Sequence, residues 1–330
     1  MKKTDCPVPR TALPSEDGCR IRHFSNETGE ARTAEYPVFP VIRMTYHEIH
    51  MRTSSPAGEE EQRFFFEIHH CHSGRMECRS GADFFYLSPG DLAVGCRIDP
   101  EHGAAFPLSR YDGITVRIDP EAAPRCLSCL LEDINVSPAA LMQKFSVGGK
   151  GYIARSHPSI AHIFAELYSV PESIRKGYFK VKILELLLFL STVEPNEKET
   201  VSHFVSGSQT ELARHASAYL TEHMERRVPL EELSLALHAS ATQIKNAFRA
   251  VYGEQPYAFI RRRKMQNAAE MLRNTDETVL KIAGRFGYDN ASKFAKAFSD
   301  VTGMTPVQYR KAPHAALFSS PADAGKNEKE

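Results

Sequence analysis

The chain has no apolar run long enough to cross a membrane as a helix. Such a helix needs about 20 consecutive apolar residues, and the longest candidate, ILELLLFLSTV (183–193), is shorter and contains Glu185. The N-terminal stretch MKKTDCPVPR has a charged start with no apolar segment behind it, unlike a secretory signal. We therefore expect a cytoplasmic protein without a membrane partner.

Motifs of catalysis are also absent. The sequence contains no GxSxG, P-loop, HExxH or dinucleotide-binding fingerprint. Its seven cysteines are an odd number in a chain without a signal sequence, which favours reduced thiols over a disulfide framework. Cys126 and Cys129 form a CxxC pair, but no second pair completes a zinc site. We expect no enzyme activity and no cofactor.

The chain has no net charge, yet its charges are unevenly distributed. Residues 211–311 contain 16 Lys and Arg against 11 Asp and Glu, whereas the rest of the chain has 25 against 30. Such an asymmetry indicates a part that binds nucleic acid joined to a part with another role.

The pattern of apolar residues predicts an α+β protein of several segments. Residues 1–35 lack periodicity and are expected to form a loose leader. In residues 36–150, short apolar runs such as RFFFEIHHC and GITVRID are separated by Gly and Pro turns, which is typical of a β-sandwich or barrel. The other predicted segments are helices at 151–194, a polar linker at 195–210, an all-helical domain at 211–311 and a polar tail at 312–330.

Within the first helical segment, residues 183–190 are apolar around most of the helix circumference. A helix of this kind is buried on all sides, either in its own domain or against a partner subunit. We predict that residues 183–190 hold a homodimer together.

The all-helical domain contains a helix–turn–helix pattern twice. In LEELSLALHASATQIKNAFRAVYG (230–253), a corner at His238-Ala239 precedes a helix capped by Ser240. Ile244 and Phe248, four residues apart, are predicted to be its buried pair.

The second copy is TVLKIAGRFGYDNASKFAKAFSDVTG (278–303), with its corner at Gly287-Tyr288. Its predicted buried pair is Phe294 and Phe298. Both second helices end at a glycine, Gly253 or Gly303, the residue that best tolerates a left-handed C-terminal position. A duplicated unit of this kind predicts two DNA-reading helices.

A long helix is predicted between the two units, from Pro256 to Arg273, and would place the reading helices in successive major grooves about 10 base pairs apart. The residues expected to reach phosphates from it are Arg261, Arg262 and Lys264. The residues expected to read bases are Thr242, Lys245, Asn246, Arg249, Asn290, Ser292, Lys293 and Lys296.

Two stretches carry a resemblance to a known family. GYDNASKFAKAFSDVTGMTPVQYRK and IKNAFRAVYGEQPYAFIRRRKMQNAAEML resemble the DNA-binding domain of AraC/XylS-family transcription regulators. The resemblance implies double-stranded DNA and RNA polymerase as partners. His238 departs from the glycine usual at the first corner; histidine is one of the few other residues enriched at positive φ, so a strained turn is expected there.

The stretch FFFEIHHCHSGRMECRSGADFFYLSPGDLAVG is similar to the cupin-like barrel that many members of this family use as a sensor. That similarity implies a small-molecule effector bound in residues 36–150, and the following helices resemble the family's dimerisation segment. We expect Phe66, His70, His72 or Tyr86 to line the effector pocket, although each would equally fill a barrel core.

A metal-binding alternative rests on His70-x-His72 followed by Glu77, which partly imitates the ligand set of cupin metalloenzymes. His70 and His72 share one face of a strand, as ligands must. Glu77 lies beyond the turn at Ser73-Gly74, and no later histidine is apparent unless His102 serves. We favour a sensor without a metal over a cupin metalloenzyme fused to a DNA-binding domain.

Overall fold

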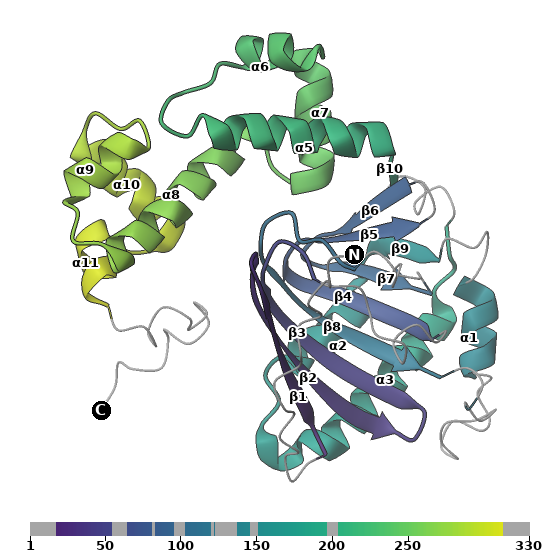
Figure 1. Cartoon of the computed structure of the whole chain (residues 1–330). Coiled ribbons are helices and arrows are strands. Elements are labelled where there is room, and N and C mark those ends of the chain that lie inside the picture. The colour runs from purple at the N-terminus through teal and green to yellow at the C-terminus, as the bar shows by residue number, and fades with distance from the viewer. Residues whose placement is uncertain are drawn as a thin grey trace, which may run out of the picture. The chain divides into compact units, whose positions relative to one another are not determined.

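The computed structural model of the chain describes residues 18–54, 65–80, 83–95, 103–119, 122, 137–145, 151–196 and 204–312 (Figure 1). The chain divides into two compact units, Met1–Ser208 and Gln209–Glu330, and each is described by itself. The boundary falls inside the predicted linker, whose last residues belong to helix α5 (Gly207–Glu222). The predicted α+β class is confirmed, with antiparallel sheets in the first unit and helices in the second.

The first unit is built on a seven-stranded sheet in the order β1-β2-β3-β8-β4-β7-β9, in which all neighbours are antiparallel. Its strands are β1 (Arg20–Asn26), β2 (Gly29–Phe39), β3 (Ile42–His50), β4 (Phe66–Gly74), β7 (Asp91–Val94), β8 (Tyr111–Ile118) and β9 (Tyr152–Arg155). The prediction of a loose leader through residue 35 is therefore wrong for β1 and the start of β2. These strands are polar and half-exposed, so they lack the apolar alternation that marks a strand with one buried face.

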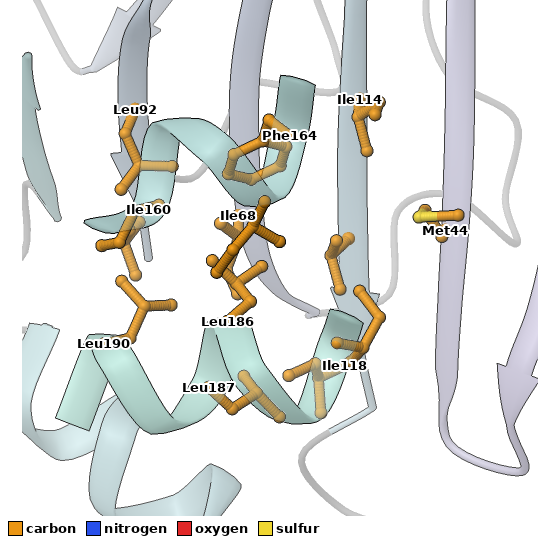
Figure 2. Close-up of a cluster of buried hydrophobic side chains, with 14 of the residues drawn as sticks. Met44, Ile68, Leu92, Ile114, Ile118, Ile160, Phe164, Leu186, Leu187 and Leu190 are labelled. Carbon is orange, nitrogen blue, oxygen red and sulfur yellow. The ribbon is translucent and has the colours of Figure 1, made fainter. Parts of the chain in front are cut away.

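Three helices cover one face of this sheet: α1 (Pro138–Phe145), α2 (Pro158–Leu167) and α3 (Arg175–Thr192), with a short 3-10 helix, η4 (Glu172–Ile174), before α3. Alternate residues of β3, β4 and β8 point toward them, because successive side chains of a strand face opposite ways. Figure 2 shows Ile68, Ile114 and Ile118 of the strands meeting Phe164 of α2 and Leu187 of α3.

Helix α3 is apolar on many sides for a reason within the chain. Ile183, Leu186, Leu187 and Leu190 are fully buried and belong to the apolar cluster between the sheet and its helices. Figure 2 shows the last three of them against the strands and α2. The argument that these residues need a partner subunit is therefore wrong, because the chain covers them itself. Val181 on the same helix is 61% exposed.

A second, three-stranded sheet packs on part of the other face of the large one. Its order is β10-β6-β5, formed by β5 (Met76–Ser80), β6 (Asp83–Leu87) and β10 (Phe204–Val205). Side chains of both sheets, such as Cys71 and Phe85, share one apolar cluster. Gly74, where the chain passes from one sheet to the other, has φ +78°, and a Cβ there would lie 2.1 Å from the carbonyl oxygen of Arg110. Across the described strands the two sheets stay separate, with no pairing that closes a barrel.

The second unit is helical. Its elements are α5, α6 (Leu230–Leu237), α7 (Ala241–Tyr252), α8 (Pro256–Asn274), α9 (Val279–Arg285), α10 (Ala291–Thr302) and α11 (Pro306–Lys311). Within this unit α8 runs from the α6–α7 pair to α9, α10 and α11 (Figure 1). Among the described helices of both units, none has the length and apolarity that crossing a membrane requires.

Candidate DNA-binding interface

The first helix–turn–helix unit consists of α6 and α7. His238 ends α6 in the left-handed conformation, with φ 50° and ψ 38°, so the strained corner expected there is confirmed. The Ser240 hydroxyl accepts from the backbone N–H of Gln243 at 3.2 Å, and the Gln243 side chain accepts from the backbone N–H of Ser240 at 2.9 Å. This reciprocal cap fixes where α7 begins.

The second helix–turn–helix unit consists of α9 and α10 and turns at Gly287, which has φ +74°. Asn290 caps α10: its side-chain oxygen accepts from the backbone N–H groups of Ser292 at 2.7 Å and Lys293 at 3.3 Å. Asn290, predicted to read a base, thus also has a structural role that the sequence reading did not assign.

The buried sides of α7 and α10 match. Ile244 and Phe248 are fully buried in α7, as are Phe294 and Phe298 in α10, as predicted from their spacing. Both helices end at a glycine with φ 75°. The residues predicted to contact bases are exposed in the structure: Thr242, Lys245, Asn246, Arg249, Asn290, Ser292, Lys293 and Lys296.

The four basic residues of these two helices, Lys245, Arg249, Lys293 and Lys296, make no ion pair with the described part of the chain. Elsewhere in the unit several arginines pair with carboxylates, so the open cations are concentrated on the two predicted reading helices. Unpaired cations on an exposed face suit contact with phosphates and base edges.

The basic run of α8 departs from its predicted role at one residue. Lys264 is buried, and its Nζ donates to the carbonyl oxygens of Arg226 at 3.1 Å and Phe286 at 3.0 Å. Burial lowers the pKa of this amine, which Glu225 partly offsets. We therefore correct the prediction that Lys264 contacts phosphate, because its ammonium is committed to the interior of the unit.

The two arginines of the same run lie nearer the surface. Arg262 donates to Glu254, with 2.6 Å between Nη2 and Oε1, and Arg261 pairs with Asp300. Both remain predicted phosphate contacts, which would require them to exchange a carboxylate partner for a phosphate.

The residues predicted to line an effector pocket lie in different places. Phe66 packs in the layer between the sheet and its helices. His70 stacks on Phe164 of α2 with 4.1 Å between ring centres, and the His72 ring lies 4.1 Å from that of Tyr168. Tyr86 belongs to the small sheet, where its hydroxyl donates to Glu77 at 2.9 Å.

These placements also bear on the metal alternative. His70 and His72 face aromatic rings, while Glu77 accepts from Tyr86. Among the described residues no group of three His, Cys, Asp or Glu side chains is arranged to hold a metal ion. Cys126, Cys129 and His102 lie outside the described residues.

A polar network that the sequence reading missed lies on the sheet face opposite the helices. The Thr115 hydroxyl lies 2.9 Å from His47 Nε2 and 3.1 Å from His69 Nδ1. His69 Nε2 lies 3.0 Å from Glu67 Oε2, and Arg117 Nε donates to Glu67 Oε1 at 2.6 Å. We call these five residues, which come from β3, β4 and β8, the His–Glu network.

The electrostatics of the His–Glu network keep its carboxylate ionised. Burial alone would raise the pKa of Glu67, but the hydrogen bond and charge of His69, together with Arg117, lower it to about 2. Burial lowers the pKa of His47 to about 3, with smaller contributions from His69 and Arg117.

These interactions set the direction of each hydrogen bond when both histidines are neutral. His69 then donates from Nε2 to Glu67 and accepts the Thr115 hydroxyl proton at Nδ1. That hydroxyl in turn accepts from His47 Nε2, so His47 Nδ1 remains an acceptor. Alternate positions on three strands carry the signal for this network, but only the pairing of the strands brings them together.

Comparisons with known proteins bear on the helical unit. Residues 233–312 match the family model described as a helix-turn-helix domain. An uncharacterised HTH-type transcriptional regulator, YisR of Bacillus subtilis, is 27% identical over 172 residues, which is 52% of this chain and 55% of YisR. The MmsAB operon regulatory protein of Pseudomonas aeruginosa is 30% identical over 94 residues, covering 28% of this chain and 31% of that protein.

Among solved structures, the C-terminal domain of AraT, a response regulator from Geobacillus stearothermophilus, is 26% identical, with a TM-score of 0.30; the match covers 36% of this chain and 96% of that domain. The chain spans about half the length of the first curated relatives it matches.

The second unit is thus a helix-turn-helix domain, defined by the paired α6–α7 and α9–α10 units and by the family match. More particularly, its sequence resembles the DNA-binding domain of the AraC/XylS family, and relatives that it matches are HTH-type transcriptional regulators.

Proposed function

We propose that the protein is a sequence-specific DNA-binding transcription regulator of the AraC/XylS type. The observation that carries the proposal is the pair of matched helices α7 and α10, each buried through two large side chains and each presenting open cations and amide or hydroxyl groups. Arg and Lys contacts to phosphates release counterions, while Asn, Lys and Ser reach base edges. RNA polymerase would be the partner through which such a regulator acts.

The test is selection of a preferred duplex from random DNA by the full chain, followed by affinity measurements at several salt concentrations. We expect one preferred sequence and an affinity that falls as salt rises. Absence of any preferred duplex at moderate salt would contradict the proposal.

We propose further that the first unit is a cupin-like sensor and that its effector binds at the His–Glu network. The support is the buried polar face formed by β3, β4 and β8, where a Glu67 carboxylate balances Arg117. Burial holds the pKa of His47 at about 3, so this imidazole is neutral near pH 7 and its Nδ1 is an acceptor. A neutral molecule rich in hydroxyl or amide groups fits this face better than an anion does.

The effector proposal is tested by thermal-shift screening of the full chain against neutral sugars, amides and nucleosides, with carboxylates as the contrasting set. A ligand that stabilises wild type but not Thr115→Val supports the site. A stabilising ligand whose effect survives Thr115→Val places the sensor elsewhere. Stoichiometric iron, manganese or zinc in purified protein would instead favour the cupin metalloenzyme alternative.

We also propose a homodimer. Its support is not the buried leucines of α3 but two outward residues of that helix, exposed Val181 and half-buried Leu184, which share one face. Val181→Glu should shift sedimentation toward the monomer without unfolding the chain. A folded Val181→Glu protein with the sedimentation of wild type would contradict this interface.

A further inference from the structure

The loop between α5 and α6 belongs to the first half of the DNA-binding unit but contacts the second half. Met224 packs against the apolar cluster formed by α8, α9 and α10, and Asn267 Nδ2 of α8 lies 3.4 Å from its sulfur. We call residues 223–226 the clasp loop. This loop adds a second connection between the first helix–turn–helix unit and the second, which are otherwise joined through α8.

Lys264 is the polar centre of this contact. Its ammonium bridges the carbonyl oxygen of Arg226 in the clasp loop, at 3.1 Å, and that of Phe286 at the end of α9, at 3.0 Å. The side chain is 9% exposed. A cation placed at a helix C-terminus is favoured by the helix dipole, and here it ties that terminus to a loop of the other half.

Gly287 provides a second, independent contact at the same place. It has φ +74°, and a Cβ at this residue would lie 2.6 Å from the carbonyl oxygen of Glu225. The corner of the second helix–turn–helix unit therefore rests directly on the clasp loop, with no room for a side chain between them.

Together these contacts constrain how the second helix–turn–helix unit, α9 and α10, rotates about the axis of α8. Helices α7 and α10 are joined through α8, so any bend or twist along α8 changes the distance and angle between them. On DNA, each added base pair displaces one half-site by about 3.4 Å and rotates it by roughly 34°. Contacts that fix the orientation of the two helix–turn–helix units therefore also fix the half-site spacing that the protein can bind.

We propose that Lys264 is a positioning residue that, with the clasp loop and Gly287, fixes the angle between the two reading helices and so sets the half-site spacing the protein selects. The inference rests on the proposed DNA-binding function. It assigns Lys264 a role in specificity without any contact to DNA. Lys264→Met leaves the carbonyl oxygens of Arg226 and Phe286 without this donor and is expected to cost stability, so the spacing preference is measured at a temperature at which the variant is shown to be folded.

The experiment measures affinity of the full chain for its selected duplex and for duplexes with one or two base pairs inserted between, or one removed from between, the two half-sites. The key variants are Lys264→Met, which keeps the length of the side chain without its donors, and Gly287→Ala, which pushes the corner off the clasp loop. Wild type is expected to lose about tenfold in affinity for each changed spacing, the loss typical of one mismatched position.

Both variants should narrow that loss to about threefold or less while still preferring the selected half-site sequences. Because both substitutions disrupt the same contact, the double variant should discriminate between spacings about as well as either single variant. The matched controls are Gly303→Ala, which has the same positive φ but open space around its Cβ, and Lys311→Met, which removes an exposed cation. Both controls should keep the spacing profile of wild type.

A folded Lys264→Met protein with the spacing profile of wild type would overturn the proposal. If that variant does not fold, Gly287→Ala decides the question on the same duplexes, and an unchanged profile there overturns it as well. Failure of wild type to select any duplex would count instead against the proposed function.

Discussion

The two units of the chain differ in how their side chains acquire roles. In the helical unit, a residue's role follows from its place in a short repeating pattern: Ile244 and Phe248 are buried in α7 just as Phe294 and Phe298 are in α10. In the sheet unit, neighbouring residues on one strand face opposite sides of the sheet and make different contacts. His69 joins the His–Glu network while His70 stacks on Phe164 of α2.

This difference shows what local sequence encodes. A helical segment of about five residues already places its buried and exposed sides, because residues i and i+4 share a face within one element. A strand only alternates, and which of its two faces is covered by helices or left polar depends on segments far along the chain. The following predictions test this contrast.

The largest expected effect is at the layer between the sheet and α3. Leu187→Ala should destabilise the first unit by about 2–5 kcal/mol, because it removes a fully buried side chain and leaves a cavity. Chemical denaturation of the full chain, with DNA binding as the readout for the second unit, separates the two effects. Val181→Ala on the same helix, at a residue that is 61% exposed, should change stability by less than about 0.5 kcal/mol. Similar losses in the free energy of unfolding for both variants would contradict the burial of Leu187 in the core.

The His–Glu network should make the first unit sensitive to acid. The folded pKa of Glu67 is about 2, below its ordinary value of 4.5, so its contribution is complete above pH 4.5 and is lost as pH falls toward 2. The loss is on the order of 3 kcal/mol. His47, with a folded pKa of about 3, adds destabilisation in the same direction as pH falls below 6.5.

Denaturant unfolding of the first unit at a series of pH values measures this dependence in wild type and Glu67→Gln. The variant should lose stability less steeply between pH 4.5 and 2, because it has no carboxylate to protonate. Parallel profiles for the two proteins would mean that the carboxylate does not carry the effect.

Base discrimination should come from both reading helices. Alanine at Asn246, Lys245, Ser292 or Lys296 should each reduce the preference for the selected duplex by about 1–3 kcal/mol. Arg262→Ala should weaken binding to all duplexes alike, since a phosphate contact carries no sequence information. Affinities on selected and scrambled duplexes separate the two classes. A change of base preference in Arg262→Ala alone would contradict the proposal that α7 and α10 read bases while Arg262 contacts phosphate.

The two helix caps should be similar in size despite their different chemistry. Ser240→Ala and Asn290→Ala should each destabilise the second unit by about 1 kcal/mol, because each removes an acceptor for backbone N–H groups at a helix start. Thermal unfolding of the full chain measures this. Asn290→Ala should additionally alter base preference if this residue contacts DNA, whereas Ser240→Ala should not.

The smallest effect distinguishes the two corners. His238→Gly should stabilise the second unit by about 0.5 kcal/mol, since glycine adopts the left-handed conformation without the cost of a Cβ but loses more conformational entropy on folding. The unfolding midpoint would rise accordingly. A fall in the midpoint would mean that the His238 side chain makes a compensating contact.

Much of the helical unit was predictable from local signals. The corner at His238, the Ser240 cap, the terminal glycines and the two buried pairs follow from spacing and residue type. Lys264 was not predictable in this way: it continues a run of three arginines, and nothing local separates it from them. Its burial results from the clasp loop and the end of α9 meeting over it.

The sequence by itself determined that the chain joins a strand-rich part to a duplicated helix–turn–helix part, because hydrophobic periods and cap residues act over only a few positions. Only the tertiary structure decided which strand faces are covered, how α3 uses its many apolar residues, and which polar residues meet. Those outcomes depend on contacts between distant segments: the Thr115 hydroxyl joins His47 to His69 only because β8 lies between β3 and β4.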